Sequence, residues 1–511
     1  MTDAPAELER RTLWATFALA VLLGLFAMND VPVGIFQDDG HYLILARALA
    51  FGDGYRYTNL PGAPAGTHFP PGFPLLLAPL WWVVPRFPAN VVFFKLFNVA
   101  LLPVAALAVR QFARQVGGLS ARAASVVAVA CCATVPLLFL NGLVFSETAF
   151  VAALCATLVI ADRLAARDPG AWHRALLLGL AVGALALLRT VGLALLPGLL
   201  FILLWRGRHR EAAGLLGGVL IVLAPWQLWM ALHGHAVPAS IAGGYGSYTG
   251  WLVDAYRVGG APFAAAVVRE NLRGLLMPLT LLGLADASPW LQAAAGLPWL
   301  ALLAAGLHDL WRRAPVTVLL LPPYLLLLIV WPFPPDRFLW PLWPVLVVAA
   351  VRGAQSLGWR AGVPARTRWF ARVVAGALVT LFLVWHVRTW PSRNWELGER
   401  ANATMGVAAA RAAAALPPGG LVASDMDAMV YLYAGRQAVP LLALTAEQHV
   451  RSRTDDELTA QLSGVLAAYH PRWVLVTERD SFRAAQLLAR RGRLKLGGAN
   501  ASGVLVYDVV P

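Results

Sequence analysis

Long apolar runs alternate with short polar stretches over most of this chain, up to about residue 390. A run of about 20 apolar residues is long enough to cross the ~30 Å hydrocarbon core of a bilayer as a helix. The pattern therefore predicts about eleven membrane-spanning helices, several of them shortened or broken by Gly, Pro or a charge. The predicted spans are approximately Leu13–Met28, Val91–Val109, Ala123–Leu140, Ala149–Ile160, Leu176–Leu188, Val191–Leu204, Leu215–Leu232, Leu291–Leu307, Pro315–Trp331, Phe338–Ala350 and Val373–Val387.

The composition supports the membrane interpretation. Of the 511 residues, 59% are hydrophobic and only 13% are charged, which is typical of a polytopic membrane protein. The three cysteines lie in apolar stretches and form no CxxC motif, so neither a disulfide framework nor redox chemistry is expected. The net charge of +14 comes almost entirely from arginine, and the placement of the arginines indicates membrane topology rather than nucleic-acid binding.

The arginines gather in alternate loops between the predicted spans. This is the positive-inside pattern if the N-terminus is cytoplasmic. The loop arginines are Arg10, Arg11, Arg110, Arg114, Arg122, Arg163, Arg167, Arg174, Arg206, Arg208, Arg210, Arg312, Arg313, Arg352, Arg360, Arg366 and Arg368. The other loops then face the periplasm or the exterior. No small-residue cleavage site follows the first apolar run, so this run is expected to remain as a span.

The chain changes character after about residue 390, where charged residues return. Short β-like runs (GGLVAS, PRWVLVTER, GVLVYDVV) alternate with helix-like runs (DAMVYLYAG, DDELTAQLSGVLAAYH, SFRAAQLLARRG). We therefore expect a transmembrane domain over residues 1–389 and a small external α/β domain over residues 390–511. Within the latter, Asp425 and Asp427 are interpreted as the cap and a first-turn acid of a helix.

Two adjacent acids, Asp38 and Asp39, stand just after the first span in the stretch FQDDGHYLILARALAFGDG. A carboxylate beside the bilayer that faces a cavity makes a plausible general base. The alternative is that these acids cap the helix that follows. Both interpretations stand for Asp39, whereas the sequence that follows favours Asp38 as the base. The apolar residues after Gly40 have helical spacing, which predicts an interfacial helix in this first external loop.

The order of motifs along the chain resembles that of GT-C glycosyltransferases, in the branch of aminoarabinose transferases and protein O-mannosyltransferases. The motifs are DDGHY, GDGY and HFPPGFPLL in the first external loop, NGLVFSETAF in the second, ALLRTVGLALLP between two short spans, and DRFLWPLWP before a late span. The resemblance covers most of the chain and implies the GT-C fold. It also implies inverting transfer of a monosaccharide from a polyprenyl-phosphate carrier, such as undecaprenyl phosphate, to a lipid, glycan or protein acceptor outside the membrane.

The resemblance assigns roles to the acids. Asp38 matches the essential aspartate of the family's first loop and would take the proton of the acceptor hydroxyl. Asp39 and Glu147 are the other catalytic candidates, and Glu147 corresponds to the family's second acidic position. Glu147 would orient the acceptor, bind a divalent ion or pair with an arginine; the alternative is an ordinary loop acid that assists a helix cap.

The departing phosphate gains negative charge, which cations must meet. Arg337 and Arg189 are the main candidates, against the alternatives of an ion pair between Arg337 and Asp336 and a snorkelling Arg189. Lys95 lies within the second predicted span. Its side chain either binds a phosphate or extends to the membrane–water interface. Where the aminoarabinose branch carries an acid-lysine-proline-proline motif this chain has HFPP, so His68 is a candidate replacement for that lysine and the donor sugar stays open.

Aromatic residues suit both sugar faces and lipid chains. The candidates for lining the substrate site are Tyr42 and Tyr57 in the first external loop, and Tyr245 and Tyr248 in the glycine-rich loop over residues 233–260 of the external segment 233–275. The glycines of that loop indicate a flexible lid. An aromatic belt at the membrane interface explains the same residues.

No metal can be inferred, because Asp38, Glu147 and His68 offer oxygen and nitrogen ligands without a diagnostic spacing. A divalent cation is therefore left open. No glycine-rich nucleotide loop is present, as expected for a lipid-linked sugar donor. The main alternative function is a lipid-linked-sugar flippase or an anion transporter, since interrupted spans with internal arginines also occur in transporters. The lack of repeated halves favours the enzyme.

The expected location is the bacterial inner membrane, with the N-terminus cytoplasmic and the active site and C-terminal domain external or periplasmic. Arginine in place of lysine and frequent alanine indicate a bacterial, GC-rich source. The expected partners are the polyprenyl-phosphate-linked sugar donor, a lipid, glycan or protein acceptor and membrane lipids, without nucleic acid.

Overall fold

The computed structural model describes residues 4–166, 170, 172–275, 284, 287–359, 362–499 and 503–510. Arg167 and Arg360 of the predicted cytoplasmic loops lie outside these residues. The chain divides into two compact units. The first unit comprises Met1–Met28, Leu96–Ala224 and Val268–Asn394, and the second comprises Asn29–Lys95, Pro225–Val267 and Trp395–Pro511. The domain boundary near residue 390 stays a prediction.

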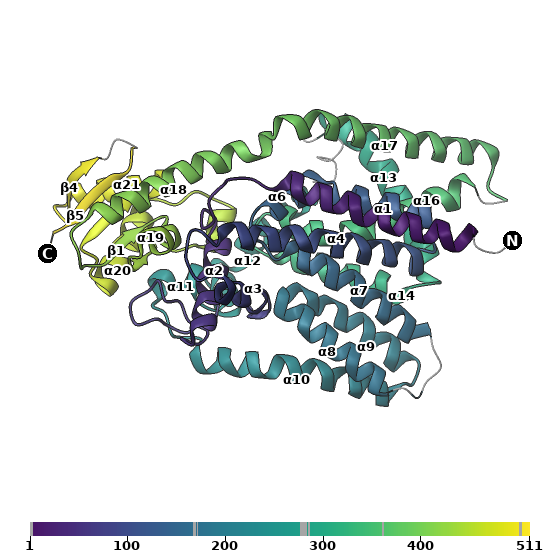
Figure 1. Cartoon of the computed structure of the whole chain (residues 1–511), viewed down its shortest axis with the longest axis horizontal. Helices are drawn as coiled ribbons and strands as arrows, with labels where there is room; N and C mark the ends of the chain where they lie inside the picture. Colours follow the sequence, from purple (N-terminus) through teal and green to yellow (C-terminus); the bar gives the residue numbers. More distant parts are fainter. Residues whose placement is uncertain are drawn as a thin grey trace. The chain divides into compact units, whose positions relative to one another are not determined.

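Each predicted span overlaps a helix (Figure 1). Among the described residues, up to eight spans are long and apolar enough to cross a membrane. They are formed by α1 (Ala4–Ala27), α4 (Val91–Gln115), α5 (Ala121–Cys132) with α6 (Val135–Gly142), α7 (Glu147–Ala166), α10 (His209–His233), α13 (Pro289–Trp311), α16 (Trp343–Gly358) with the turns before it, and α17 (Ala365–Ser392). The other predicted spans match the shorter helices α8 (Trp172–Leu188), α9 (Leu195–Trp205) after η1 (Thr190–Ala194), and α14 (Pro315–Val330). The helices are confirmed, whereas the number eleven is not.

The third predicted span is broken rather than continuous. Helices α5 and α6 are bent by 59° relative to each other. The break follows Cys132, and Pro136 occupies the first turn of α6, where its missing N–H costs nothing because that turn has no intrahelical acceptor for it. The hydroxyl of Thr134 donates to the carbonyl of Cys131 at 3.1 Å, which satisfies one backbone acceptor at the break.

Helices α13 and α16 approach each other closely within the first unit. A Cβ atom on Gly306 would lie 1.7 Å from the carbonyl oxygen of Ala349, and one on Gly353 would lie 1.9 Å from that of Leu302. Only glycine fits at these two positions. Small residues at a crossing allow two membrane helices to gain van der Waals contact along their backbones, which is the main attraction available in lipid.

The second unit contains the segment predicted to be the first external loop, which forms α2 (Gln37–Phe51) and α3 (Gly72–Val83). The segment over residues 233–275 was predicted to be a flexible loop, but most of it is helical: η2 (Ala239–Ile241), α11 (Ala242–Tyr245) and α12 (Tyr248–Gly274). Helix α12 bends at Gly260, whose φ of 58° is open to glycine but unfavourable for other residues. The paired glycines and Pro262 hid this helix from the sequence pattern.

Residues 395–511 of the second unit form a small α/β part, as predicted. Its sheet has the order β2-β1-β3-β5-β4, with β1 parallel to β2 and β3, and with β5 antiparallel to β3 and β4. The strands are β1 (Val422–Ser424), β2 (Ala438–Val439), β3 (Trp473–Val476), β4 (Leu494–Ala499) and β5 (Leu505–Val509). The helices are α18 (Leu397–Ala415), α19 (Asp427–Ala434), α20 (Asp455–Tyr469) and α21 (Arg479–Arg490). Two-residue β2 and glycine-containing β4 gave no strand signal.

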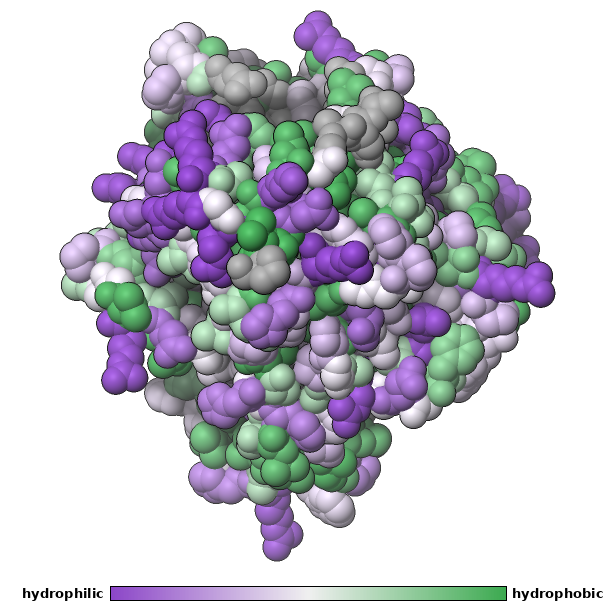
Figure 2. All heavy atoms as spheres, turned by 90° about the vertical axis from the view of Figure 1, so that its left-hand side faces the viewer, coloured by the Kyte–Doolittle hydropathy of each residue, from purple (hydrophilic) through white to green (hydrophobic). Residues whose placement is uncertain are grey.

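The core of the α/β part lies where alanines of α18 pack against β1, β3 and α19. Hydrophilic side chains cover much of the face shown in Figure 2, as expected for a surface in contact with water. Asp427 is a first-turn acid, as predicted. Asp425 was predicted to cap the helix that contains Asp427, but its carboxylate binds the backbone just before α21. Its Oδ2 accepts the N–H groups of Thr477 and Glu478 at 2.8 and 3.0 Å.

The predicted first external loop and the α/β part are joined by direct contacts within the second unit. The guanidinium of Arg47 on α2 donates to the hydroxyl of Tyr431 on α19 at 2.5 Å. The backbone N–H of Ala438 in β2 donates to the carbonyl of Asn59 at 3.0 Å. The loop and the α/β part therefore support each other.

Candidate active site

The N-terminus of α2 is organised around the carboxylate of Asp39, which is fully buried. Its Oδ2 accepts the N–H of Gly34 at 2.8 Å, and its Oδ1 accepts those of Phe36 and Gly40 at 3.0 and 2.9 Å. Burial raises the pKa of Asp39 to about 7, although the three N–H groups favour the charged form. Asp39 is thus committed to holding the turn before α2, which is the capping interpretation.

Asp38 is half-buried in the first turn of α2, and its charge acts on two buried side chains of the same unit. Burial lowers the pKa of His68 to about 4, and the carbonyl of Gly246 and the charge of Asp38 oppose this change. Burial raises the pKa of Tyr57 well above its usual value, and Asp38 adds to the increase. The structure therefore brings Asp38, His68 and Tyr57 of the predicted site near one another.

His68 is held by the segment that precedes α12. Its Nδ1 lies 2.8 Å from the carbonyl oxygen of Gly246, and its ring centroid lies 3.7 Å from that of Tyr248. An imidazole with a pKa of about 4 is neutral at neutral pH, so Nδ1–H donates to the carbonyl and Nε2 is left as an acceptor. A neutral ring supplies no positive charge, which argues against His68 as a replacement for a phosphate-binding lysine.

The remaining predicted lining residues form an aromatic cluster in the same unit. The ring of Tyr42 packs on Phe69 and Phe73 with centroid distances of 4.9 and 5.0 Å. Tyr57 and Tyr245 lie 4.7 Å apart. Both are fully buried, which argues against an exposed aromatic belt at the membrane interface as the explanation of Tyr245.

Sequence reasoning missed the polar partners of Tyr245. Its hydroxyl donates to the carboxylate of Asp427, and Nδ2 of Asn59 donates to that hydroxyl at 2.6 Å. His41 was also missed; its buried ring lies 4.4 Å from that of Tyr245. Asp427 is 182 residues from Tyr245 along the chain, so no local pattern connects them. The one available signal was the spacing of His41, which is three residues after Asp38 and therefore on the same face of the helix.

Asp427 gives the stability of the protein a specific pH dependence. Burial raises its pKa to about 7, while the bond from Tyr245 favours the charged form. The folded state therefore holds a proton that the unfolded state loses near pH 3.8, and this contribution to stability falls as the pH rises from about 4 to about 7. We expect the melting temperature of the wild type relative to Asp427→Asn to fall across this window. Thermal unfolding in detergent at several pH values measures it, and a constant difference would contradict the assignment.

Lys95 lies at the start of α4 and uses its ammonium group locally. Nζ donates to the carbonyls of Asn29 and Val31 at 2.9 and 2.6 Å and to Oδ1 of Asn29 at 2.6 Å. An ammonium group has three N–H donors, so these three acceptors satisfy it. We assign Lys95 a structural role in fixing the backbone before α2 rather than a role in phosphate binding.

Lys95→Met tests this assignment, because methionine keeps the length of the side chain and removes the donors. We expect the loss of stability to be about 2 kcal/mol or more, since two buried carbonyls and an amide oxygen lose their partner. The affinity of the folded protein for undecaprenyl phosphate should not change. Weaker binding at an unchanged melting temperature would instead assign Lys95 to the donor site.

The first unit contains a second cluster of predicted residues. Oε1 of Glu147, the first residue of α7, lies 2.7 Å from Nη1 of Arg189 and 2.6 Å from Nε of Arg337. The Glu147 side chain is fully buried, whereas those of Arg189 and Arg337 are 10% and 28% exposed. The guanidinium of Arg337 also lies over the ring of Phe145, 4.3 Å from its centroid. The structure thus joins three predicted residues from distant parts of the chain.

This cluster has a clear electrostatic character. One carboxylate between two guanidinium groups leaves an excess positive charge, which suits an anion. The carboxylate of Glu147 pairs directly with both guanidinium groups. Of the roles open for Glu147, pairing with an arginine is therefore the one that its contacts favour.

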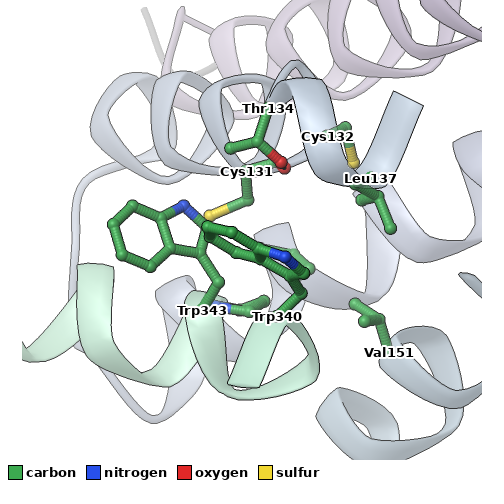
Figure 3. A pocket seen from close by; sticks show the side chains of 9 residues that line it. Cys131, Cys132, Thr134, Leu137, Val151, Trp340 and Trp343 are labelled. Atoms are coloured by element: carbon green, nitrogen blue, oxygen red, sulfur yellow. The ribbon is translucent and has the colours of Figure 1, made fainter. Parts of the chain in front are cut away.

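Two other features bear on the chemistry. The described residues include no group of three or more His, Cys, Asp or Glu side chains arranged to hold a metal ion. A small pocket in the first unit is lined by apolar side chains together with Cys131, Cys132, Thr134, Trp340 and Trp343 (Figure 3). Its lining includes neither an acid nor a base, so it belongs to the helix packing rather than to the candidate site.

Comparisons with known proteins bear on the fold. No protein-family model and no curated protein matches the sequence. ArnT from Cupriavidus metallidurans, solved bound to undecaprenyl phosphate, shares 14% identity over 98% of this chain and 97% of its own, with a TM-score of 0.54. The oligosaccharyltransferase AglB from Archaeoglobus fulgidus, solved with an inhibitory peptide and a dolichol-phosphate, shares 13% identity over 91% of this chain and 69% of its own, also with a TM-score of 0.54.

A further structure of the Archaeoglobus fulgidus oligosaccharyltransferase, in complex with Zn and sulfate, has a TM-score of 0.56 at 14% identity and covers 97% of this chain and 73% of its own. These proteins belong to the GT-C superfamily. This chain is an integral membrane protein with the GT-C fold, which confirms the fold class predicted from the order of its motifs.

Proposed function

We propose that this protein is an inverting glycosyltransferase that moves a monosaccharide from a polyprenyl-phosphate carrier to a lipid, glycan or protein acceptor. The observation that carries the proposal is the division of roles between two adjacent acids at the start of α2. Asp39 is committed to three backbone N–H groups, whereas Asp38 is half-buried beside neutral His68 and Tyr57. The GT-C fold supports the proposal, because two proteins of this fold were solved with polyprenyl phosphates bound.

Asp38 is the proposed general base. Its carboxylate takes the proton of the acceptor hydroxyl as the hydroxyl oxygen attacks the anomeric carbon of the donor sugar. The bond between that carbon and the phosphate oxygen breaks, and both of its electrons leave with the polyprenyl phosphate. A single displacement of this kind inverts the configuration at the anomeric carbon.

The leaving group is proposed to be stabilised by the Glu147–Arg189–Arg337 cluster. The carrier phosphate gains a negative charge when the glycosidic bond breaks, and donors placed beforehand stabilise that charge most effectively. Arg337 has the more exposed side chain and is assigned to the phosphate. Arg189 is nearly buried and, through its bond to Glu147, holds the cluster together. Adding EDTA to the transfer reaction measures any requirement for a divalent cation.

We propose that the N-terminus is cytoplasmic, that the membrane is the bacterial inner membrane, and that residues 1–389 form its catalytic transmembrane domain. The first loop and the α/β domain over residues 390–511 are then external. The bonds between Arg47 and Tyr431 and between Asn59 and Ala438 support this topology, because bonded segments must lie on the same side of a membrane. The arginine-rich loops are the expected cytoplasmic ones.

A flippase for lipid-linked sugars is the alternative, and one experiment separates the two. Purified protein is placed in liposomes with polyprenyl-phosphate monosaccharides labelled in the sugar, together with membrane extract as a source of acceptors. Appearance of the label in a product that resists mild acid, which cleaves the sugar from its carrier phosphate, supports the transferase. Movement of intact donor between leaflets without such a product supports the flippase.

A further inference from the structure

The side chain of His41 on α2 is fully buried, and neither of its ring nitrogens has a hydrogen-bond partner among the described residues. Its ring lies among aromatic rings, at centroid distances of 4.4 Å from Tyr245, 5.4 Å from Tyr57 and 5.7 Å from Phe69. Leaving two polar atoms unpaired in the interior costs folding free energy. The presence of such an unpaired side chain in the interior indicates that its hydrogen-bond partner is a bound ligand rather than another residue of the protein.

A second side chain with an unpaired atom lies in the same cluster. Oδ1 of the buried Asn59 has no partner among the described residues, whereas its Nδ2 donates to the hydroxyl of Tyr245 and, at 3.5 Å, to the carboxylate of Asp427. Reversing the amide would turn its oxygen toward that carboxylate, so the observed orientation is the favoured one. Asn59 and His41 therefore both contact Tyr245 and both retain a free hydrogen-bonding atom.

The chemistry of these atoms selects a class of ligand. Burial lowers the pKa of His41 to about 3, so the ring is neutral and offers one N–H donor and one nitrogen acceptor. The amide oxygen of Asn59 adds an acceptor. Neither side chain carries positive charge to bind a phosphate, whereas mixed donors and acceptors with aromatic walls suit a neutral ligand with hydroxyl groups and apolar C–H faces, such as a sugar ring.

Tyr245 covers this group of atoms. Its ring packs on those of His41 and Tyr57, and its hydroxyl is fixed by Asp427 of α19 and by Asn59. His41 is fully buried, and the ring of Tyr245 lies nearer to it than those of Tyr57 and Phe69, so movement of Tyr245 would open a way to it. The bond to Asp427 therefore allows the α/β part to hold the cover in place.

We propose that His41 binds a sugar hydroxyl group beside Asp38, with Asn59 as a second ligand and Tyr245 as the movable cover. His41 follows Asp38 by three residues on α2, so the two side chains share a helix face. The inference rests on the proposed function only in that the sugar belongs to its donor or to its acceptor.

His41→Phe tests the proposal, because it keeps an aromatic ring and removes both nitrogens. We expect an equal or higher melting temperature, since unpaired buried atoms are removed, together with a loss of sugar transfer of about tenfold or more. His41→Leu is the second variant if phenylalanine is too large for the site. The matched control is His386→Phe on α17, which removes a buried ring that also has an unpaired nitrogen and should not affect transfer.

Binding without acceptor identifies the source of the sugar. Donor labelled in its sugar is compared with bare undecaprenyl phosphate on wild type and variant. If His41→Phe no longer prefers the sugar-bearing lipid, His41 binds the sugar of the donor. If the preference is unchanged but transfer is impaired, His41 binds a sugar of the acceptor. Unchanged preference and transfer, or a clear fall in melting temperature with full activity in the folded fraction, would overturn the proposal.

The same comparison separates this inference from the proposed function. If wild type transfers no sugar but prefers the sugar-bearing lipid, and His41→Phe loses that preference, the transferase is wrong and the sugar site stands. If wild type neither transfers sugar nor prefers the sugar-bearing lipid, both are wrong.

Discussion

Replacing Asp38 by asparagine is expected to lower the rate of sugar transfer by about two to four orders of magnitude, the usual contribution of a general base. Asparagine has nearly the same shape as aspartate but cannot take the proton of the acceptor hydroxyl. The Asp38 side chain is half-buried, so its neutral replacement should leave the melting temperature almost unchanged. Initial rates with labelled donor, at equal amounts of folded protein, measure the effect.

Asp39→Asn is the matched control for this prediction. The amide offers one oxygen in place of the two that accept the N–H groups of Gly34, Phe36 and Gly40, and its NH₂ group would face donors. We therefore expect a loss of stability, with transfer by the folded fraction affected less than in Asp38→Asn. If Asp38→Asn transfers sugar at the full rate while Asp39→Asn is stable but inactive, Asp39 is the general base and Asp38 has the structural role.

Arg337→Ala is expected to weaken binding of undecaprenyl phosphate by about 10- to 100-fold, because hydrogen bonds to charged groups contribute roughly 1.5–3 kcal/mol. Its Nε atom bonds Glu147, and 28% of its side chain is exposed, so a phosphate can approach the guanidinium group. Direct binding of labelled undecaprenyl phosphate to the purified variant measures the effect.

Two variants serve as controls for Arg337. Arg337→Lys keeps the charge and loses the planar fork, so its affinity should lie between those of the wild type and the alanine variant. Arg372 lies over the ring of Trp359 and donates to the carbonyl of Gly358, which makes Arg372→Ala a control for the loss of an arginine packed on an aromatic ring. Equal weakening by Arg372→Ala and Arg337→Ala would indicate a general charge effect and contradict the phosphate assignment.

Much of the fold could be predicted from the sequence because a helix that crosses a lipid bilayer needs about 20 mostly apolar residues, and such runs are visible in the sequence. Among the described residues, each helix long and apolar enough to cross a membrane overlaps a predicted apolar run, and charged β-like and helix-like runs marked the α/β part. Breaks were harder to predict: the bend between α5 and α6 comes at Thr134, within one continuous apolar run. Helix α12 was missed because its glycines and Pro262 lower the helical signal that its contacts then override.

The candidate site was predictable only in part, because side-chain partners lie far apart along the chain. The sequence selected Glu147 and Arg337, but the bond between them joins residues that are 190 positions apart. The sequence could not show that the ammonium group of Lys95 donates to the backbone carbonyls of Asn29 and Val31. The pattern of apolar residues does not indicate which carbonyls lie near a lysine in the folded protein. The competing roles of Asp39 likewise required the positions of three N–H groups.

The stoichiometry of transfer by the purified wild-type protein in liposomes tests the central claim most directly. Labelled sugar transferred and polyprenyl phosphate released are measured together in the same sample. The proposed reaction predicts one carrier released for each sugar transferred, and a rate of formation of both products about two to four orders of magnitude lower with Asp38→Asn. Sugar-bearing carrier that crosses the bilayer intact, with no release of polyprenyl phosphate, would contradict the account.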